Sequence, residues 1–179
     1  MRRWLLLVWF AFLLFATVFA PSQLETDILE MSKRLTLFDW HNPALCGLWY
    51  ATGTVLFCHA TFYFAERPQH RPHPMLVLVL STILGALVML PYYALRQVDP
   101  TRAPWAWPWR VLRYILLVEF VGFVVYGVVA GDLAELWYEI THRRFSSFLI
   151  IDCVLLLALL PLARTPTIAS TSDRPPRVH

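Results

Sequence analysis

Five long apolar runs, separated by polar segments, dominate the pattern of hydrophobic and polar positions along this 179-residue chain. The hydrocarbon core of a bilayer is about 30 Å thick, and a helix rises about 1.5 Å per residue, so runs of about 20 residues suit a crossing. The shortest run, Ser147–Leu162, crosses only with help from its flanks. The pattern predicts an all-α membrane protein, in which residues 1–165 form one bundle of about five transmembrane helices. The expected spans are residues 4–20, 44–65, 75–95, 112–130 and 147–162.

Two further stretches predict amphipathic helices at the membrane interface. Leu24–Phe38 and Leu133–Phe145 both repeat apolar residues at helical spacing opposite charged ones, and Asp132 is the expected N-cap of the second. Such a helix either covers its own bundle or contacts the membrane surface, and the pattern is compatible with both. In the second helix, the expected apolar stripe is Leu133, Trp137 and Ile140, opposite Glu135, Glu139 and Arg143.

The two ends of the chain differ in character. The first run, Trp4–Ala20, follows two arginines and resembles a signal peptide. Because Pro21 would hinder cleavage after Ala20, we expect an uncleaved first helix. The last residues, 166–179, are rich in Thr, Ser, Pro and Arg and predict a disordered tail.

Composition agrees with a membrane protein. The chain is 58% hydrophobic and only 15% charged, whereas a soluble domain averages about 25% charged residues. The net charge of +3 is small and scattered, so we expect the lipid bilayer, and no nucleic acid, as a partner. Cys46, Cys58 and Cys153 all fall in expected spans without a CxxC motif, and we expect them to pack as small apolar residues.

Lysine and arginine residues give little guidance on the orientation of a five-span bundle. Its two sides carry similar numbers of them, with a small excess on the side opposite the N-terminus. Because cytoplasmic loops are enriched in Lys and Arg, this excess favours that side as the cytoplasmic one. Arg2 and Arg3, beside the first helix, favour the reverse orientation.

Two acids lie inside the expected spans, where an unpaired charge costs roughly 3 kcal/mol or more. Helix rise places Asp152 close to the depth of His59, and it places Glu119 within reach of Arg96 or a tyrosine hydroxyl. The cluster fits a proton relay or a polar pocket for a pigment, quinone or lipid headgroup. It equally fits plain hydrogen bonding between helices by protonated acids. The candidate buried polar site is Asp152, His59, Glu119, Arg96, Tyr92 and Tyr93.

Other motifs add packing expectations and no chemistry. Pro91 predicts a kink in the third run, because it frees a backbone carbonyl one turn earlier. Only His59 lies deep in a span, and the half-motif Glu139-x-x-His142 has no second copy, so we expect no metal site. The sequence identifies neither a cofactor nor catalytic residues. Small residues four apart predict close helix approach at Gly47/Ala51, Ser81/Gly85 and Gly127/Gly131.

Three stretches of the chain share a recognisable pattern: FDWHNPALCGLWYATG (Phe38–Gly53), GALVMLPYYALRQ (Gly85–Gln97) and RFSSFLIIDCVLLLALLPL (Arg144–Leu162). Together they resemble a family of small integral membrane proteins abundant in cyanobacteria and plant plastids. The resemblance implies a membrane architecture, a bacterial source and a photosynthetic or pigment-linked setting, but no reaction. Where that family often has acids after the last helix, this chain has Ala163, Arg164 and Thr165. The matching positions are Asn42, Pro43, Gly85, Pro91, Tyr92, Arg96 and Asp152.

These features predict a non-enzymatic membrane protein, either an accessory subunit or a protein that binds a pigment or other apolar ligand. The expected location is the bacterial cytoplasmic (inner) membrane, with other membrane subunits or a hydrophobic ligand as partners. The alternative is a membrane enzyme or proton-coupled carrier that acts on a lipid or isoprenoid through its buried acids.

Overall fold

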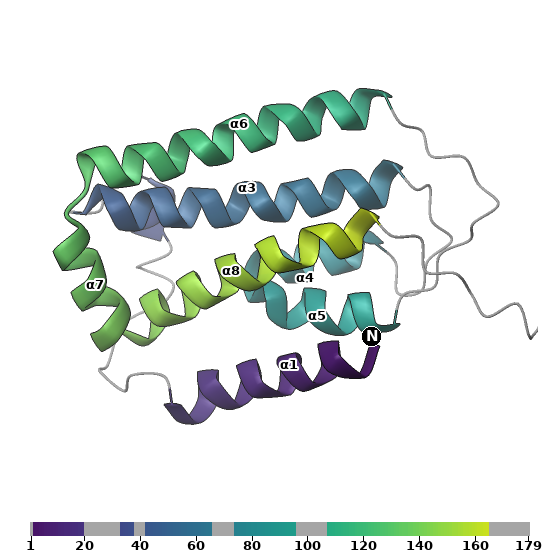
Figure 1. Ribbon diagram of the computed structural model, residues 1–179, viewed down its shortest axis with the longest axis horizontal. Coiled ribbons are helices and arrows are strands. Elements are labelled where there is room, and N and C mark those ends of the chain that lie inside the picture. Colours follow the sequence, from purple (N-terminus) through teal and green to yellow (C-terminus); the bar gives the residue numbers. More distant parts are fainter. Residues whose placement is uncertain (1, 20–32, 38–41, 66–73, 96–106, 165–179) are drawn as a thin grey trace, which may run out of the picture.

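The computed structural model describes residues 2–19, 33–37, 42–65, 74–95 and 107–164, which contain helices and no strand. Four long helical segments lie side by side (Figure 1). This confirms the all-α prediction. The tail and most of the amphipathic stretch Leu24–Phe38 lie outside the described residues. The four segments are α1 (Arg2–Leu14) with the π-helical turn η1 (Phe15–Phe19), α3 (Pro43–Ala65), α6 (Trp107–Ala130) and α8 (Arg144–Arg164).

Two helices in the described part of the chain are long and apolar enough to cross a membrane. They are α6, over Trp107–Ala130, and α8, over Arg144–Leu162. α3 is as long as these but carries several buried polar side chains, including Thr52, Thr54 and His59, which lower its hydropathy. Length and composition therefore leave the predicted five-span bundle unconfirmed.

The third expected span, residues 75–95, is not one helix. It forms α4 (Pro74–Leu84) and α5 (Ala86–Leu95), which are separated by Gly85 with a φ of 51°. The Gly85 N–H donates to the Ser81 carbonyl at 2.8 Å. With its left-handed backbone, Gly85 caps the C-terminus of α4 and ends this helix. The outer ends of both helices lie at the same end of the bundle (Figure 1). α4 and α5 are therefore a hairpin, and the prediction of a single third span is wrong.

Pro91 lies inside α5 and does not end it, because the break comes six residues earlier, at Gly85. The carbonyl that Pro91 leaves without a helical partner belongs to Leu87. Trp9 of α1 donates its indole N–H to this carbonyl at 2.8 Å. The proline therefore fixes α1 against the hairpin, where α1 makes most of its contacts.

Small residues allow α3 and α6 to pack closely. A Cβ on Gly47 would lie 2.6 Å from the Phe123 carbonyl oxygen and 3.0 Å from the Gly127 Cα. A Cβ on Gly131 would similarly overlap Ala44. The predicted role of Gly47 and of Gly127/Gly131 in close helix approach is confirmed.

The second amphipathic stretch forms α7 (Leu133–His142), which crosses one end of the bundle between α6 and α8 (Figure 1). Asp132 caps it, as predicted, by accepting from the N–H groups of Ala134 at 2.8 Å and Glu135 at 3.1 Å. The packed face differs from the expected stripe, because Glu139 is only 5% exposed, whereas Trp137 is 68% exposed. α7 therefore directs apolar surface away from its own bundle.

Candidate functional site

Asp152 of α8 reaches the tip of the α4–α5 hairpin. Its Oδ1 accepts a hydrogen bond from the Ala86 N–H at 2.6 Å. The first N–H groups of a helix have no partner within the helix, and an acid beside them also meets the positive end of the helix dipole. The carboxyl group packs so closely against Gly85 that a side chain at that position would overlap it. Asp152 therefore acts as an N-cap for α5 from a different helix.

His59 of α3 is fully buried and uses both of its ring nitrogens. Nε2 lies 2.9 Å from the carbonyl oxygen of Leu156, and Nδ1 lies 2.7 Å from the hydroxyl of Tyr93. Because a carbonyl only accepts, Nε2 carries the proton, and the neutral ring accepts from the Tyr93 hydroxyl at Nδ1. His59 thus links α3, α5 and α8.

The hairpin explains why Asp152 and His59 have separate partners instead of the expected contact with each other. Because α4 and α5 return to one end, α3 and α8 run in the same direction through the bundle (Figure 1). Counted from their starts at the α7 end, Asp152 lies about 12 Å along α8 and His59 about 24 Å along α3. A five-span order would have reversed α8 and brought the two side chains to similar depths.

The remaining predicted site residues divide into two groups. Tyr92 and Tyr93 are buried near His59, and their rings meet edge to face at 5.6 Å. Glu119 is exposed near the middle of α6, and it forms no hydrogen bond or ion pair with another described residue. Arg96 lies outside the described residues. The structure therefore joins His59 to Tyr93 by a hydrogen bond and gives Glu119 no such bond to either residue.

Sequence reasoning missed the contacts of Arg113, in the second turn of α6. Its Nε donates to the Thr61 hydroxyl at 3.1 Å, and its guanidinium lies 3.4 Å from the centre of the Phe62 ring. The signal in the sequence was an arginine at the second position of the expected span 112–130. A cation over an aromatic ring is stabilised by the electron density of its face. Arg113 therefore fastens the start of α6 to the end of α3.

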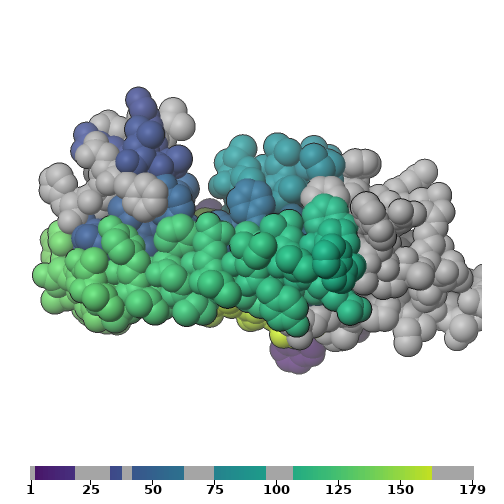
Figure 2. Space-filling view, turned by 90° about the horizontal axis from the view of Figure 1, so that it is seen from above, coloured from purple at the N-terminus to yellow at the C-terminus, as the bar shows by residue number. Residues whose placement is uncertain are grey.

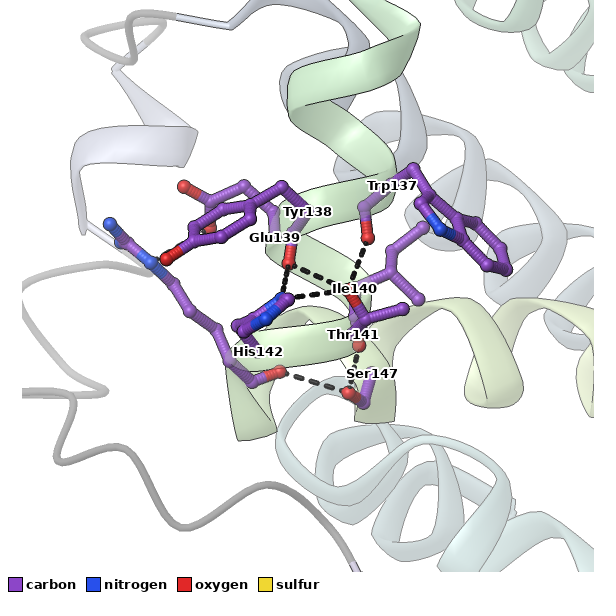
Figure 3. A network of polar contacts seen from close by, with 8 residues as sticks. Trp137, Tyr138, Glu139, Ile140, Thr141, His142 and Ser147 are labelled. Carbon is purple, nitrogen blue, oxygen red and sulfur yellow. Dashed lines mark hydrogen bonds and ion pairs between the residues drawn. The ribbon is translucent and has the colours of Figure 1, made fainter.

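A second set of polar contacts holds the corner between α7 and α8 (Figure 3). The Thr141 hydroxyl donates to the Trp137 carbonyl at 2.9 Å, and the His142 ring stacks on Tyr138 with centroids 4.1 Å apart. Ser147, in the first turn of α8, donates to the carbonyl oxygens of Ile140 and, at 3.0 Å, Arg143. The bond to Ile140 satisfies one of the last carbonyls of α7, so Ser147 joins the end of α7 to the start of α8.

The buried Glu139 is the charged member of this corner. Its Oε2 lies 3.0 Å from the Arg143 Nε. Burial raises the pKa of the Glu139 carboxyl, and the charge of Glu135 adds to this, whereas the charge of Arg143 acts in the opposite direction. Within the described residues, no group of three or more His, Cys, Asp or Glu side chains is placed to hold a metal ion.

Comparisons with protein-family models, with curated proteins and with solved structures give no match to this chain.

Proposed function

We propose that this chain is an integral membrane protein that serves as a non-enzymatic accessory subunit of a larger assembly in the bacterial cytoplasmic membrane. The observation that carries the proposal is the position of Asp152. A catalytic or relay acid must reach a substrate or a proton path. The Asp152 carboxyl is buried instead against Gly85 and bonded to the Ala86 N–H, so it supports the fold.

The membrane location is supported by the hydrogen bonds that the backbone N–H and C=O groups form at the break between α4 and α5. Inside hydrocarbon, non-helical backbone is tolerated only where protein groups replace water. At the break, the Gly85 N–H donates to Ser81, the Ala86 N–H donates to Asp152, and the Leu87 carbonyl accepts from Trp9. These contacts suit a re-entrant hairpin, with α1, α3, α6 and α8 as four crossing helices.

A re-entrant hairpin also changes the distribution of charge. It returns the chain to the end at which α1 begins (Figure 1). By chain order, only Lys33, Arg34, Arg143 and Arg144 then belong to segments attached at the α7 end, and the rest of the 15 Lys and Arg residues belong to helices or connecting segments attached at the other end. Because cytoplasmic segments are enriched in these residues, the proposal places that other end in the cytoplasm. In the five-span interpretation, the two sides carried similar numbers of Lys and Arg residues, whereas with the hairpin they differ clearly.

One observation favours a membrane carrier or enzyme as the second candidate. Carriers often bind their cargo where a broken helix exposes the ends of its two halves, and α4 and α5 meet in this way beside an acid. In that case, the Asp152 carboxyl would bind a cation, a proton or a polar group of a lipid. The resemblance carried by Pro91 and Asp152 fits either candidate, and family membership is part of this proposal.

Replacement of Asp152 separates the two candidates. Asp152→Asn keeps an oxygen that accepts from the Ala86 N–H but does not titrate, whereas Asp152→Leu removes the acceptor. For an accessory subunit, Asp152→Asn should rescue a deletion strain and copurify with the same partners as the wild type. Asp152→Leu should lose about 1 kcal/mol or more of stability, the usual loss when a cap is removed.

A matched control is Glu135→Gln, which removes an exposed acid of α7 and should lower stability much less than Asp152→Leu and preserve rescue. A stable Asp152→Asn protein that fails to rescue would favour the carrier or enzyme. Purification of the wild type in mild detergent as a lone, monodisperse protein would count against an accessory subunit.

A further inference from the structure

Glu119 lies where a membrane helix rarely carries an acid without a partner. It is near the middle of α6, about 17 Å from either end, and α6 is a candidate span. Its side chain is exposed, and within the described residues it forms no hydrogen bond or ion pair. A charge in hydrocarbon is strongly unfavourable unless it is paired or hydrated. The exposed carboxyl therefore calls for a group that the described residues do not supply.

The surface around Glu119 suits the approach of another helix. Ile115, Gly122 and Tyr126 are exposed and lie one or two turns from Glu119 on the same side of α6. A Cβ added at Gly122 would meet nothing within 4 Å, so the backbone is open at this point. Figure 2 shows that α6 (green) is uncovered along its length. We call these four residues the Glu119 stripe.

We propose that the Glu119 stripe is the docking surface for a transmembrane helix of a partner protein that carries a lysine or arginine at mid-membrane depth. This inference rests on the proposed accessory function and names the chemistry of the partner. In hydrocarbon, an acid and a base each offset part of the cost of the other's charge, because their attraction is strong at low dielectric. Gly122 lets the partner backbone come close, as small residues do in membrane helix pairs.

Two other occupants fit the surface less well. Two copies of this chain with the same orientation are related by an axis along the membrane normal, so Glu119 would face Glu119 at the same depth. Like charges at that distance disfavour each other's ionised form. Lipid headgroups lie about 15 Å from the middle of the hydrocarbon, which is beyond the reach of a glutamate side chain.

The test uses the full chain, purified and reconstituted in phosphatidylcholine vesicles, with a fluorescent label. The probe is a synthetic polyleucine transmembrane helix with one lysine at its midpoint, and the matched probe has leucine there. Energy transfer reports association. We expect the lysine probe to bind the wild-type chain at least about tenfold more tightly than the leucine probe, which is the scale of interhelical polar contacts.

Glu119→Gln should abolish this preference, and Glu135→Gln, which removes an acid outside the expected spans, should preserve it. Because Glu119 is exposed, Glu119→Gln should keep the melting temperature of the wild type. The inference is overturned by equal binding of the two probes, by a normal preference in Glu119→Gln, or by a fall in its melting temperature. Glu119-dependent energy transfer between two copies of the chain would overturn it in favour of a homodimer. The purified system contains no natural partner, so failure here is distinct from failure to copurify a subunit.

Discussion

Asp152 lies on α8, yet its carboxylate takes the position that the side chain of an N-cap residue would hold for α5. The residue that precedes α5 is Gly85, which has no side chain and whose φ of 51° suits glycine. The acceptor for the Ala86 N–H therefore comes from another helix: it is the Oδ1 atom of Asp152, 2.6 Å from the Ala86 nitrogen. A side chain at position 85 and the carboxyl of Asp152 would occupy the same space. The two residues work as one unit that closes the tip of the hairpin.

At the same scale, Glu139 should make stability depend on pH. Its pKa is raised by burial, above the usual value of 4.5. As pH rises above about 4.5, the unfolded chain releases this proton before the folded chain does, so the free energy of unfolding falls until the folded pKa is passed. We expect the melting temperature of the wild type to fall with pH across this window, relative to Glu139→Gln.

The measurement is thermal unfolding in detergent across a pH series, and the quantity compared is the difference between the wild type and Glu139→Gln. Glu135→Gln is the control, because it removes only a smaller contribution to the raised pKa and should keep most of the slope. A difference that rises with pH would mean that the ion pair with Arg143 outweighs burial.

The individual residues of the candidate site were easier to predict than their contacts. Asp152, His59 and Tyr93 are polar residues within apolar runs, and all three are buried. Glu119 shares that pattern but is exposed, because exposure depends on which side of α6 packs against α3. The depth of a residue in the bundle can be calculated from helix rise only when the direction of its helix is known. The hairpin reverses the direction of α8 relative to the five-span prediction.

Among the helices, the pairing of α3 with α6 depends most directly on residue size. A Cβ at Gly47 would lie 2.6 Å from a backbone oxygen of α6, and a backbone atom has no rotamer with which to move away. Gly47→Ala should therefore push the two helices apart and cost about 1–3 kcal/mol, as overpacking does in tight cores. Gly53→Ala, on the same helix, is the matched control, because its Cβ would meet nothing within 4 Å.

Thermal or chemical unfolding of the two variants in detergent gives the comparison. Both substitutions raise helix propensity equally, so the difference between them isolates the contact. Equal stability of Gly47→Ala and Gly53→Ala would show that α3 and α6 do not need their close approach.

Hydrophobic patterning located the long helices well, because α3, α6 and α8 are single apolar runs. It failed for α4 and α5, since an apolar run of 21 residues has the length of one span whether or not it reverses. The signal for the reversal was Gly85. In the sequence it was interpreted only as one of two small residues, with Ser81, that allow close helix packing. α7 shows a similar limit, because its apolar stripe fits a bundle and a membrane surface equally.

At the scale of the whole molecule, the hairpin decides which parts of the chain share one side of the membrane. In Figure 2, the teal atoms of α4 and α5 extend beside only part of the length of α6. In the proposed topology, four crossing helices and a hairpin would place the start of α4, the end of α5 and the start of α6 on the cytoplasmic side, and α7 on the opposite side. A five-span bundle would instead separate the two ends of residues 75–95.

Cysteine accessibility in cells tests this topology most directly. In a chain whose three buried native cysteines are replaced by alanine, single cysteines would be placed at the exposed positions Met75, Leu95, Trp107 and Trp137. A membrane-impermeant maleimide would then be applied to intact and to permeabilised cells. We predict that Met75→Cys, Leu95→Cys and Trp107→Cys react only after permeabilisation, and that Trp137→Cys reacts in intact cells. Labelling of Met75→Cys and Leu95→Cys from opposite sides of the membrane would contradict the re-entrant hairpin.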